Sequence, residues 1–247
     1  MTPGLRQGRR NPVKYRMPSP ELIKSSLPNG HRSIMASRQE DKDSRDFFPT
    51  PPWATRALIE KVLPRLGVRV MNTVWEPACG EGHMSDVLSD YTTNGRERTR
   101  ILRVVATDAF EYGYNQKFDF LKGPIALSER PAWIITNPPF KQKSIPFVLR
   151  SLDLARVGVG MFVRSQWINE GLERYRKIFK PKPPTLIAFF TERVNLCKGR
   201  WDPDGSTATA YCWVVWLHGA RRRPPYWIPP GCRKKYTHPD DRERFAK

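Results

Sequence analysis

The chain has little cysteine and histidine, and neither is arranged in a metal-binding pattern. The four cysteines include no Cys-x-x-Cys pair, and the four histidines are equally scattered: Cys79, Cys197, Cys212, Cys232, His31, His83, His218 and His238. This spacing indicates neither a zinc site nor a disulfide framework. We therefore expect reduced thiols and no bound metal.

Long hydrophobic runs are also missing. No segment approaches the roughly 18 consecutive apolar residues that a membrane-spanning helix needs, and the N-terminus lacks the apolar region of a signal peptide. These absences predict a soluble cytoplasmic protein with no membrane partner.

Acidic residues are scarce relative to basic ones. Against 43 Lys and Arg there are 24 Asp and Glu, which gives a net charge of +19 and a pI near 10.2. Such an excess attracts polyanions, so nucleic acid is the first partner class to consider and a membrane surface the second. With 247 residues, 39% of them hydrophobic, the chain suffices for one α/β domain with extensions.

The basic residues gather at both ends. Residues 1–45 hold Lys and Arg side chains among Pro, Gly and Ser, which predicts a disordered basic arm; these side chains include Arg6, Arg9, Arg10, Lys14, Arg16, Lys24, Arg32 and Arg38. Met35 offers a second start, in which case residues 1–34 are an upstream extension. We expect a folded domain over residues 46–220 and a basic, proline-rich, disordered tail over 221–247.

A strand, an acid, a glycine loop and a helix follow one another in the first half of the domain. After a helix over 53–66, which Thr50 can cap, a strand over 72–75 ends at Glu76 and the loop carries Gly80 and Gly82. Glycines let a loop backbone approach a ligand at a helix N-terminus. Ser85 replaces the third glycine of a dinucleotide fingerprint, and the Lys of a Walker loop is missing, which disfavours both of those site types.

Two further acids follow strand-like runs. Asp108 ends the run 101–107, and Asp119 lies between two rings, Phe118 and Phe120, where a third strand could end. Each acid alone is typical of a solvated loop. Because the carboxyl ends of parallel strands meet at one edge of a sheet, together they predict one crevice there.

The stretch Asn137-Pro138-Pro139-Phe140 follows a fourth apolar strand, 132–136. Two prolines fix the backbone, so that the Asn side chain and the ring of Phe140 have set directions. Alone, this stretch is equally typical of a rigid strand exit.

Helices expected over 144–154 and 171–179 alternate with strands over 157–163, 185–190 and 211–217. The alternation predicts an α/β fold with a seven-stranded, mostly parallel, doubly wound sheet.

These motifs in this order resemble the class I S-adenosylmethionine-dependent methyltransferases, with a Rossmann-like sheet, and most closely the small bacterial and phage enzymes that methylate the N6 amine of adenine in DNA. The resemblance covers about residues 46–217. It implies that the cofactor S-adenosyl-L-methionine is bound by Thr50, Pro51, Glu76, Ala78, Gly80, Gly82, Asp108, Asp119 and Phe120. It implies that Asn137, Pro138, Pro139 and Phe140 are the catalytic residues, with Asn137 and Pro138 holding the target amine and Phe140 stacked on the base.

This chemistry depends on positioning, because the sulfonium of the cofactor already provides a good leaving group and neither a metal nor a covalent nucleophile is needed. DNA is the expected substrate and RNA the alternative, since the chain lacks the large target-recognition domain of restriction-type enzymes. An amide nitrogen of a protein glutamine needs the same two acceptors, and a binding protein that keeps the fold without turnover is a further alternative. The oligomeric state stays open.

Overall fold

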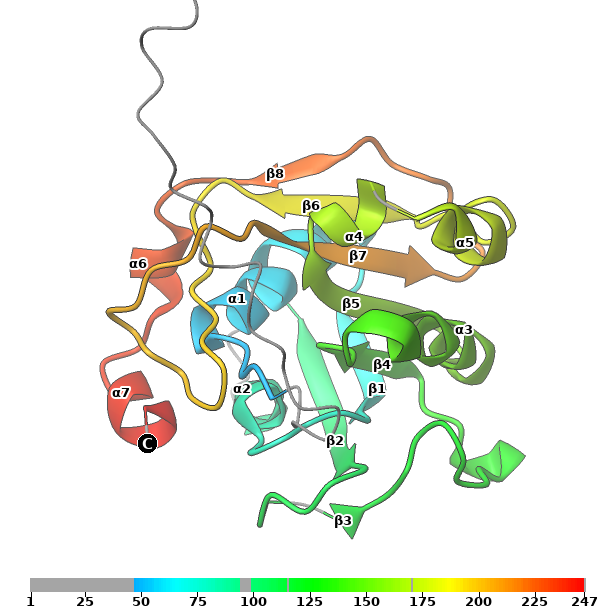
Figure 1. Ribbon diagram of the computed structural model, residues 1–247, viewed down its shortest axis with the longest axis horizontal. Coiled ribbons are helices and arrows are strands. Elements are labelled where there is room, and N and C mark those ends of the chain that lie inside the picture. Colours follow the sequence, from blue (N-terminus) through cyan, green and yellow to red (C-terminus); the bar gives the residue numbers. More distant parts are fainter. Residues whose placement is uncertain (1–46, 94–98, 115, 170, 247) are drawn as a thin grey trace, which may run out of the picture. The chain divides into compact units, whose positions relative to one another are not determined.

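The computed structural model describes residues 47–93, 99–114, 116–169 and 171–246. The basic arm expected over residues 1–45 lies outside them. Residues 45–247 form one compact unit, in which helices lie on both faces of a central sheet (Figure 1).

The sheet has eight strands in the order β3-β2-β1-β4-β5-β7-β6-β8. Their bounds are β1 Val70–Glu76, β2 Arg100–Asp108, β3 Gln116–Lys117, β4 Trp133–Thr136, β5 Gly158–Arg164, β6 Leu186–Phe190, β7 Tyr211–Leu217 and β8 Tyr226–Ile228. In this order, the strands from β3 to β5 run parallel to one another, and β7 is antiparallel to both β5 and β6. The doubly wound α/β sheet is confirmed, with one strand more than expected.

The longer helical segments fall where hydrophobic residues recur at helical spacing. They are α1 Pro52–Ala57, continued by the turns η3 Leu58–Val62 and η4 Leu63–Leu66, then α2 His83–Thr93, η5 Leu127–Glu129, η6 Lys141–Lys143, α3 Ser144–Leu154, α4 Gln166–Asn169, α5 Leu172–Arg174, η7 Tyr175–Phe179, α6 Cys232–Tyr236 and α7 Asp241–Phe245. The expected cap is wrong: the helix starts at Pro52 after Pro51, and the first turn of α1 has no side-chain cap.

Two hydrophobic clusters cover the two faces of the sheet. Alternation along β4 sends Trp133 and Ile135 to the cluster under α1 and α2, and Ile134 to the cluster under α3. All three are almost fully buried, which explains why β4 reads as a continuous apolar run.

The disordered C-terminal tail was a wrong expectation. After residue 220 the chain forms β8, which pairs in parallel with β6, and then α6 and α7. Ile228, Cys232, Tyr236 and Phe245 are buried in the same cluster as α1 and α2. Widely spaced apolar residues therefore fix this basic segment, and the Pro-Pro pairs on either side of β8 are tolerated because β8 is an edge strand.

The third strand was also misplaced. Residues Phe118–Phe120 follow β3 and form no strand, because the two-residue β3 already ends at Lys117. Among the described residues, no helix is both long enough and apolar enough to span a membrane.

Candidate functional site

The predicted crevice lies at the edge where β1, β2 and β4 end. Glu76 is the last residue of β1, Asp108 the last of β2, and Asn137 directly follows β4. Because β1 pairs in parallel with both β2 and β4, all three residues reach the same edge of the sheet. The structure thus brings together the three strand-end side chains that the sequence indicated.

Asp108 ties the glycine loop to β2. Its Oδ2 accepts a hydrogen bond from the backbone N–H of Gly80 at 2.9 Å, and its Oδ1 accepts one from Phe110 N–H at 2.9 Å. The loop is also held by Cys79, whose N–H donates to the Thr107 carbonyl at 3.1 Å. Burial raises the pKa of the Cys79 thiol, so this cysteine stays protonated and is no candidate nucleophile.

Gly80 and Gly82 are required by the loop geometry and by two aromatic rings. Their φ angles of 52° and 87° lie in the left-handed region that favours glycine. A Cβ at Gly80 would lie 2.3 Å from the ring of Phe47, and one at Gly82 would lie 2.3 Å from the ring of Tyr114. These rings therefore cover one side of the loop, a role that the sequence did not indicate.

Glu76 is buried, with 2% of its surface exposed, and its Oε2 accepts a hydrogen bond from Ser85 Oγ at 2.5 Å. Burial raises the pKa of Glu76 to about 8; the Ser85 hydrogen bond opposes this rise and the nearby Asp108 charge adds to it. At neutral pH the side chain is therefore mostly protonated.

Asn137 has one satisfied and one unsatisfied polar atom. Its Nδ2 donates to the Phe48 carbonyl at 3.0 Å, which fixes the orientation of the amide. Its Oδ1 is buried and has no hydrogen-bond partner within the part of the chain that the structure describes. A buried acceptor without a partner is costly, so such an atom in a rigid setting is a candidate ligand contact.

Three side chains surround the exit of β4. The rings of Phe48 and Phe140 meet edge to face, with centroids 5.1 Å apart. The guanidinium of Arg164, at the end of β5, lies 4.8 Å above the Phe140 ring and 5.9 Å from the Phe48 ring. Immediately after Phe140, Lys141 has a φ of 59°, the one non-glycine residue in the left-handed region among those described.

The remaining predicted residues lie in different settings. Ala78 and Pro139 are half-buried in the two loops, Pro138 and Thr50 are buried, and Pro51 lines a pocket of about 610 Å³ together with Trp53, Trp201 and Arg233. The Asp119 carboxylate accepts a hydrogen bond from Leu121 N–H at 3.0 Å.

Phe120, a further predicted cofactor-binding residue, lies in the hydrophobic core. Its ring packs 5.2 Å from Trp75 and 4.5 Å from Phe147, with 2% of its surface exposed. The side chain is therefore part of the core under α3.

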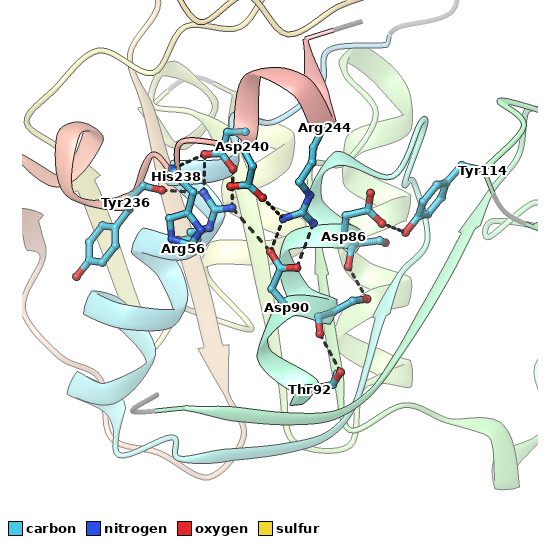
Figure 2. Close-up of polar contacts among 12 residues, drawn as sticks. Arg56, Asp86, Asp90, Thr92, Tyr114, Tyr236, His238, Asp240 and Arg244 are labelled. Carbon is cyan, nitrogen blue, oxygen red and sulfur yellow. Dashed lines mark hydrogen bonds and ion pairs between the residues drawn. The ribbon is translucent and has the colours of Figure 1, made fainter. Parts of the chain in front are cut away.

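A network of ion pairs holds α7 against α1 and α2 (Figure 2). Arg56, with 1% exposure, donates two hydrogen bonds of 2.7 Å to Asp241, and Arg244 donates two of 3.0 Å to Asp90. Asp240 and Asp241 lie with His238 in a metal-like cluster, but both carboxylates already pair with arginines.

The same C-terminal segment reaches the glycine loop through His83. The Nε2 of His83 lies 3.0 Å from the Phe245 carbonyl, and the centroid of its ring lies 5.6 Å from that of Phe245 and 6.1 Å from that of Phe47. The distribution of charged residues along the sequence could not predict these contacts, because they join residues more than 150 positions apart in sequence.

No family model and no curated protein matches this sequence. Solved structures match it in fold. The type I restriction-modification methyltransferase subunit of Streptococcus thermophilus aligns with a TM-score of 0.53, 10% identity, and coverage of 75% of this chain and 48% of the other. A protein described as a class I S-adenosylmethionine-dependent methyltransferase, from Listeria monocytogenes, gives a TM-score of 0.51, 10% identity, and 72% and 64% coverage.

A third structure, described as a modification subunit of a type I restriction enzyme from Vibrio vulnificus, gives a TM-score of 0.50, 14% identity, and 82% and 52% coverage. This chain thus spans between about half and two thirds of the length of these proteins. At such identities the likeness concerns the fold, which is the Rossmann-like fold of class I methyltransferases.

Proposed function

We propose that the protein is an S-adenosylmethionine-dependent methyltransferase that acts on the exocyclic N6 amine of adenine in DNA. The observation that carries this proposal is the buried Oδ1 of Asn137, which lacks a partner among the described residues. The Asn137 amide is fixed by the carbonyl of Phe48, and the Phe48 ring in turn meets the ring of Phe140. An acceptor held rigidly next to a stacking ring suits a planar base that carries an N–H donor.

The acidic side chains near the strand ends fit the cofactor. S-adenosylmethionine carries cationic groups and hydroxyls, which suit the carboxylates of Asp108 and Asp119. Glu76 is mostly protonated at neutral pH and would contribute hydrogen bonds. Gly80, Gly82 and Ala78 would line it, with Thr50 and Pro51 at its methionine end. When bound, the cofactor supplies an electrophilic methyl group.

The residues of the chain position the amine. The Oδ1 of Asn137 and the carbonyl of Pro138 each accept one N–H, which draws the nitrogen lone pair out of conjugation with the ring and toward the methyl donor. Asn137 does this without placing a negative charge beside the sulfonium. The prolines fix the direction of the carbonyl, and Phe140 holds the base by stacking, worth about 1–3 kcal/mol.

The net charge of +19 favours nucleic acid as the substrate and opposes a small protein substrate. DNA is preferred over RNA because two of the structural neighbours are described as a modification subunit of a type I restriction enzyme and a methyltransferase subunit of a type I restriction-modification system. A base within a duplex must first be flipped out, at a cost of a few kcal/mol. We place this activity in the cytoplasm, in a bacterial or phage-encoded protein.

Transfer of a labelled methyl group tests the proposal. Purified protein with labelled cofactor is offered duplex DNA, ribosomal RNA and a glutamine-containing protein, and the labelled DNA is digested to nucleosides. Label in N6-methyladenine from DNA is expected. Label in another polymer or nucleoside would contradict the proposal, and no transfer to any polymer would favour a binding protein.

Asn137→Ala is expected to reduce transfer about a hundredfold or more, because the amine loses a preorganised partner, while cofactor affinity stays within about twofold of wild type. Asn72→Ala, an exposed Asn on β1, is the matched control and should leave both unchanged. Full transfer by Asn137→Ala would remove Asn137 from the reaction. Asp108→Asn should instead weaken cofactor binding, measured by calorimetry.

A further inference from the structure

Arg164 has a setting that neither the glycine loop nor the Asn-Pro-Pro-Phe stretch explains. It is the last residue of β5, the strand next to β4, and its guanidinium lies over the Phe140 ring. The Nε atom is buried and has no hydrogen-bond partner among residues that the structure describes. A guanidinium is a permanent donor, so this N–H is available at any physiological pH.

The buried Nε–H of Arg164 and the buried Oδ1 of Asn137 form a donor and acceptor set around the same two rings. Asn137 is fixed through the Phe48 carbonyl, and Arg164 lies within 6 Å of the ring centroids of both Phe48 and Phe140. Each atom lacks a partner in the part of the chain that has been described. A ligand that satisfies both must present a donor to Asn137 and an acceptor to Arg164.

We propose that Arg164 is a specificity-determining residue that donates its Nε–H to the ring nitrogen next to the methylated amine. In adenine, N1 and N7 are the acceptors that flank the N6 amine. This inference rests on the proposed function and deepens it, because it assigns a hydrogen-bond donor to a ring nitrogen of the target adenine.

The burial of Nε favours a base nitrogen over a backbone phosphate. Phosphates stay at the solvent-facing side of a bound strand, where exposed Lys and Arg side chains reach them. Arg164 is only half-exposed, and it packs on rings where the base would stack. Its side chain is also oriented by Tyr211, which lies within hydrogen-bonding reach of it.

The test compares duplexes in which the methylated adenine, mapped first with the wild-type protein, is replaced by 7-deazaadenine or by 1-deazaadenine. Wild-type kcat/KM is expected to fall about tenfold or more on one of the two analogues, because a buried donor loses its acceptor. Arg164→Met and Arg164→Lys lack the Nε–H donor. For these variants, the kcat/KM values on adenine and on that analogue should agree within about twofold. 1-Deazaadenine also lacks the Watson–Crick acceptor N1 and pairs more weakly, so each duplex is compared between variants.

Arg222→Met removes an exposed guanidinium from the loop between β7 and β8 and should keep the wild-type ratio between adenine and analogue. Folding of every variant is checked by thermal unfolding and cofactor affinity. Equal use of both analogues by wild type, or an unchanged ratio in the Arg164 variants, would overturn the inference while leaving the methylation of adenine intact. Absence of any adenine methylation by wild type would overturn the proposed function and this inference with it.

Discussion

Glu76 shows how strongly the fold changes the chemistry of a single residue. Its folded pKa of about 8 lies above the ordinary value of 4.5, so the folded state keeps a proton that the unfolded chain releases. The contribution of this proton on Glu76 to the free energy of unfolding is fully present below pH 4.5 and is lost as the pH rises toward 8. At pH 7 the loss is about 3 kcal/mol, from about 2.5 pH units at 1.36 kcal/mol each.

Glu76→Gln should therefore make stability less dependent on pH, since Gln cannot ionise. We expect the difference between the urea midpoints at pH 5 and pH 8 to shrink in the variant, with a gain in stability at pH 8. Glu81→Gln changes an exposed acid in the same loop and should behave as wild type. An unchanged pH profile in Glu76→Gln would mean that Glu76 is ionised in the folded protein.

At the same scale, local pattern predicts strand-end residues and misses their neighbours. Asn137 and Asp108 were found because each follows an apolar run, and the structure places both at one edge of the sheet. Arg164 ends β5 by the same rule and could have been found in this way. Phe47 and Tyr114 could not, because their contacts with Gly80 and Gly82 depend on loops folding together.

At the scale of elements, the helix α7 shows how a segment of only five residues is fixed to the rest of the domain. It attaches through the buried Arg56–Asp241 pair, in which both side chains are 1% exposed. Removing one partner of a buried pair leaves an uncompensated charge, which costs about 3–5 kcal/mol, whereas an exposed pair contributes about 1 kcal/mol or less.

Asp241→Ala should accordingly destabilise the protein by about 3–5 kcal/mol in urea unfolding. Arg242→Ala, which breaks the exposed Arg242–Asp204 pair of the same helix, should cost about 1 kcal/mol or less. Asp241→Asn keeps the side-chain shape and should lie between them. Equal losses for Asp241→Ala and Arg242→Ala would show that the docking of α7 does not depend on the buried pair.

The C-terminal elements also show where sequence reasoning failed. Composition identified a basic, proline-rich segment, and the segment is indeed largely exposed, yet four widely spaced apolar side chains anchor it. A three-residue strand and two five-residue helices are too short to show a hydrophobic period. The long alternation of β1 to β7 with helices was, in contrast, sufficient to predict the doubly wound sheet.

For the whole molecule, the charge of +19 has a measurable consequence for nucleic-acid binding. Each phosphate neutralised by Lys or Arg releases counterions, so the logarithm of the binding constant falls with the logarithm of salt concentration in proportion to the number of phosphate contacts. Basic residues lie both in residues 1–45 and in the compact unit of residues 45–247, so both parts can contribute.

Deletion of residues 1–45 should weaken binding to duplex DNA at low salt and make the salt dependence less steep, while cofactor affinity stays unchanged because the strand-end site lies in the compact unit. Fluorescence anisotropy over a range of salt concentrations gives the slope. A full-length variant with the Lys and Arg of residues 1–45 changed to Gln separates charge from length and should match the deletion. If the deletion kept the wild-type slope, all phosphate contacts would come from the compact unit, because the slope is proportional to the total number of phosphate contacts that the protein makes.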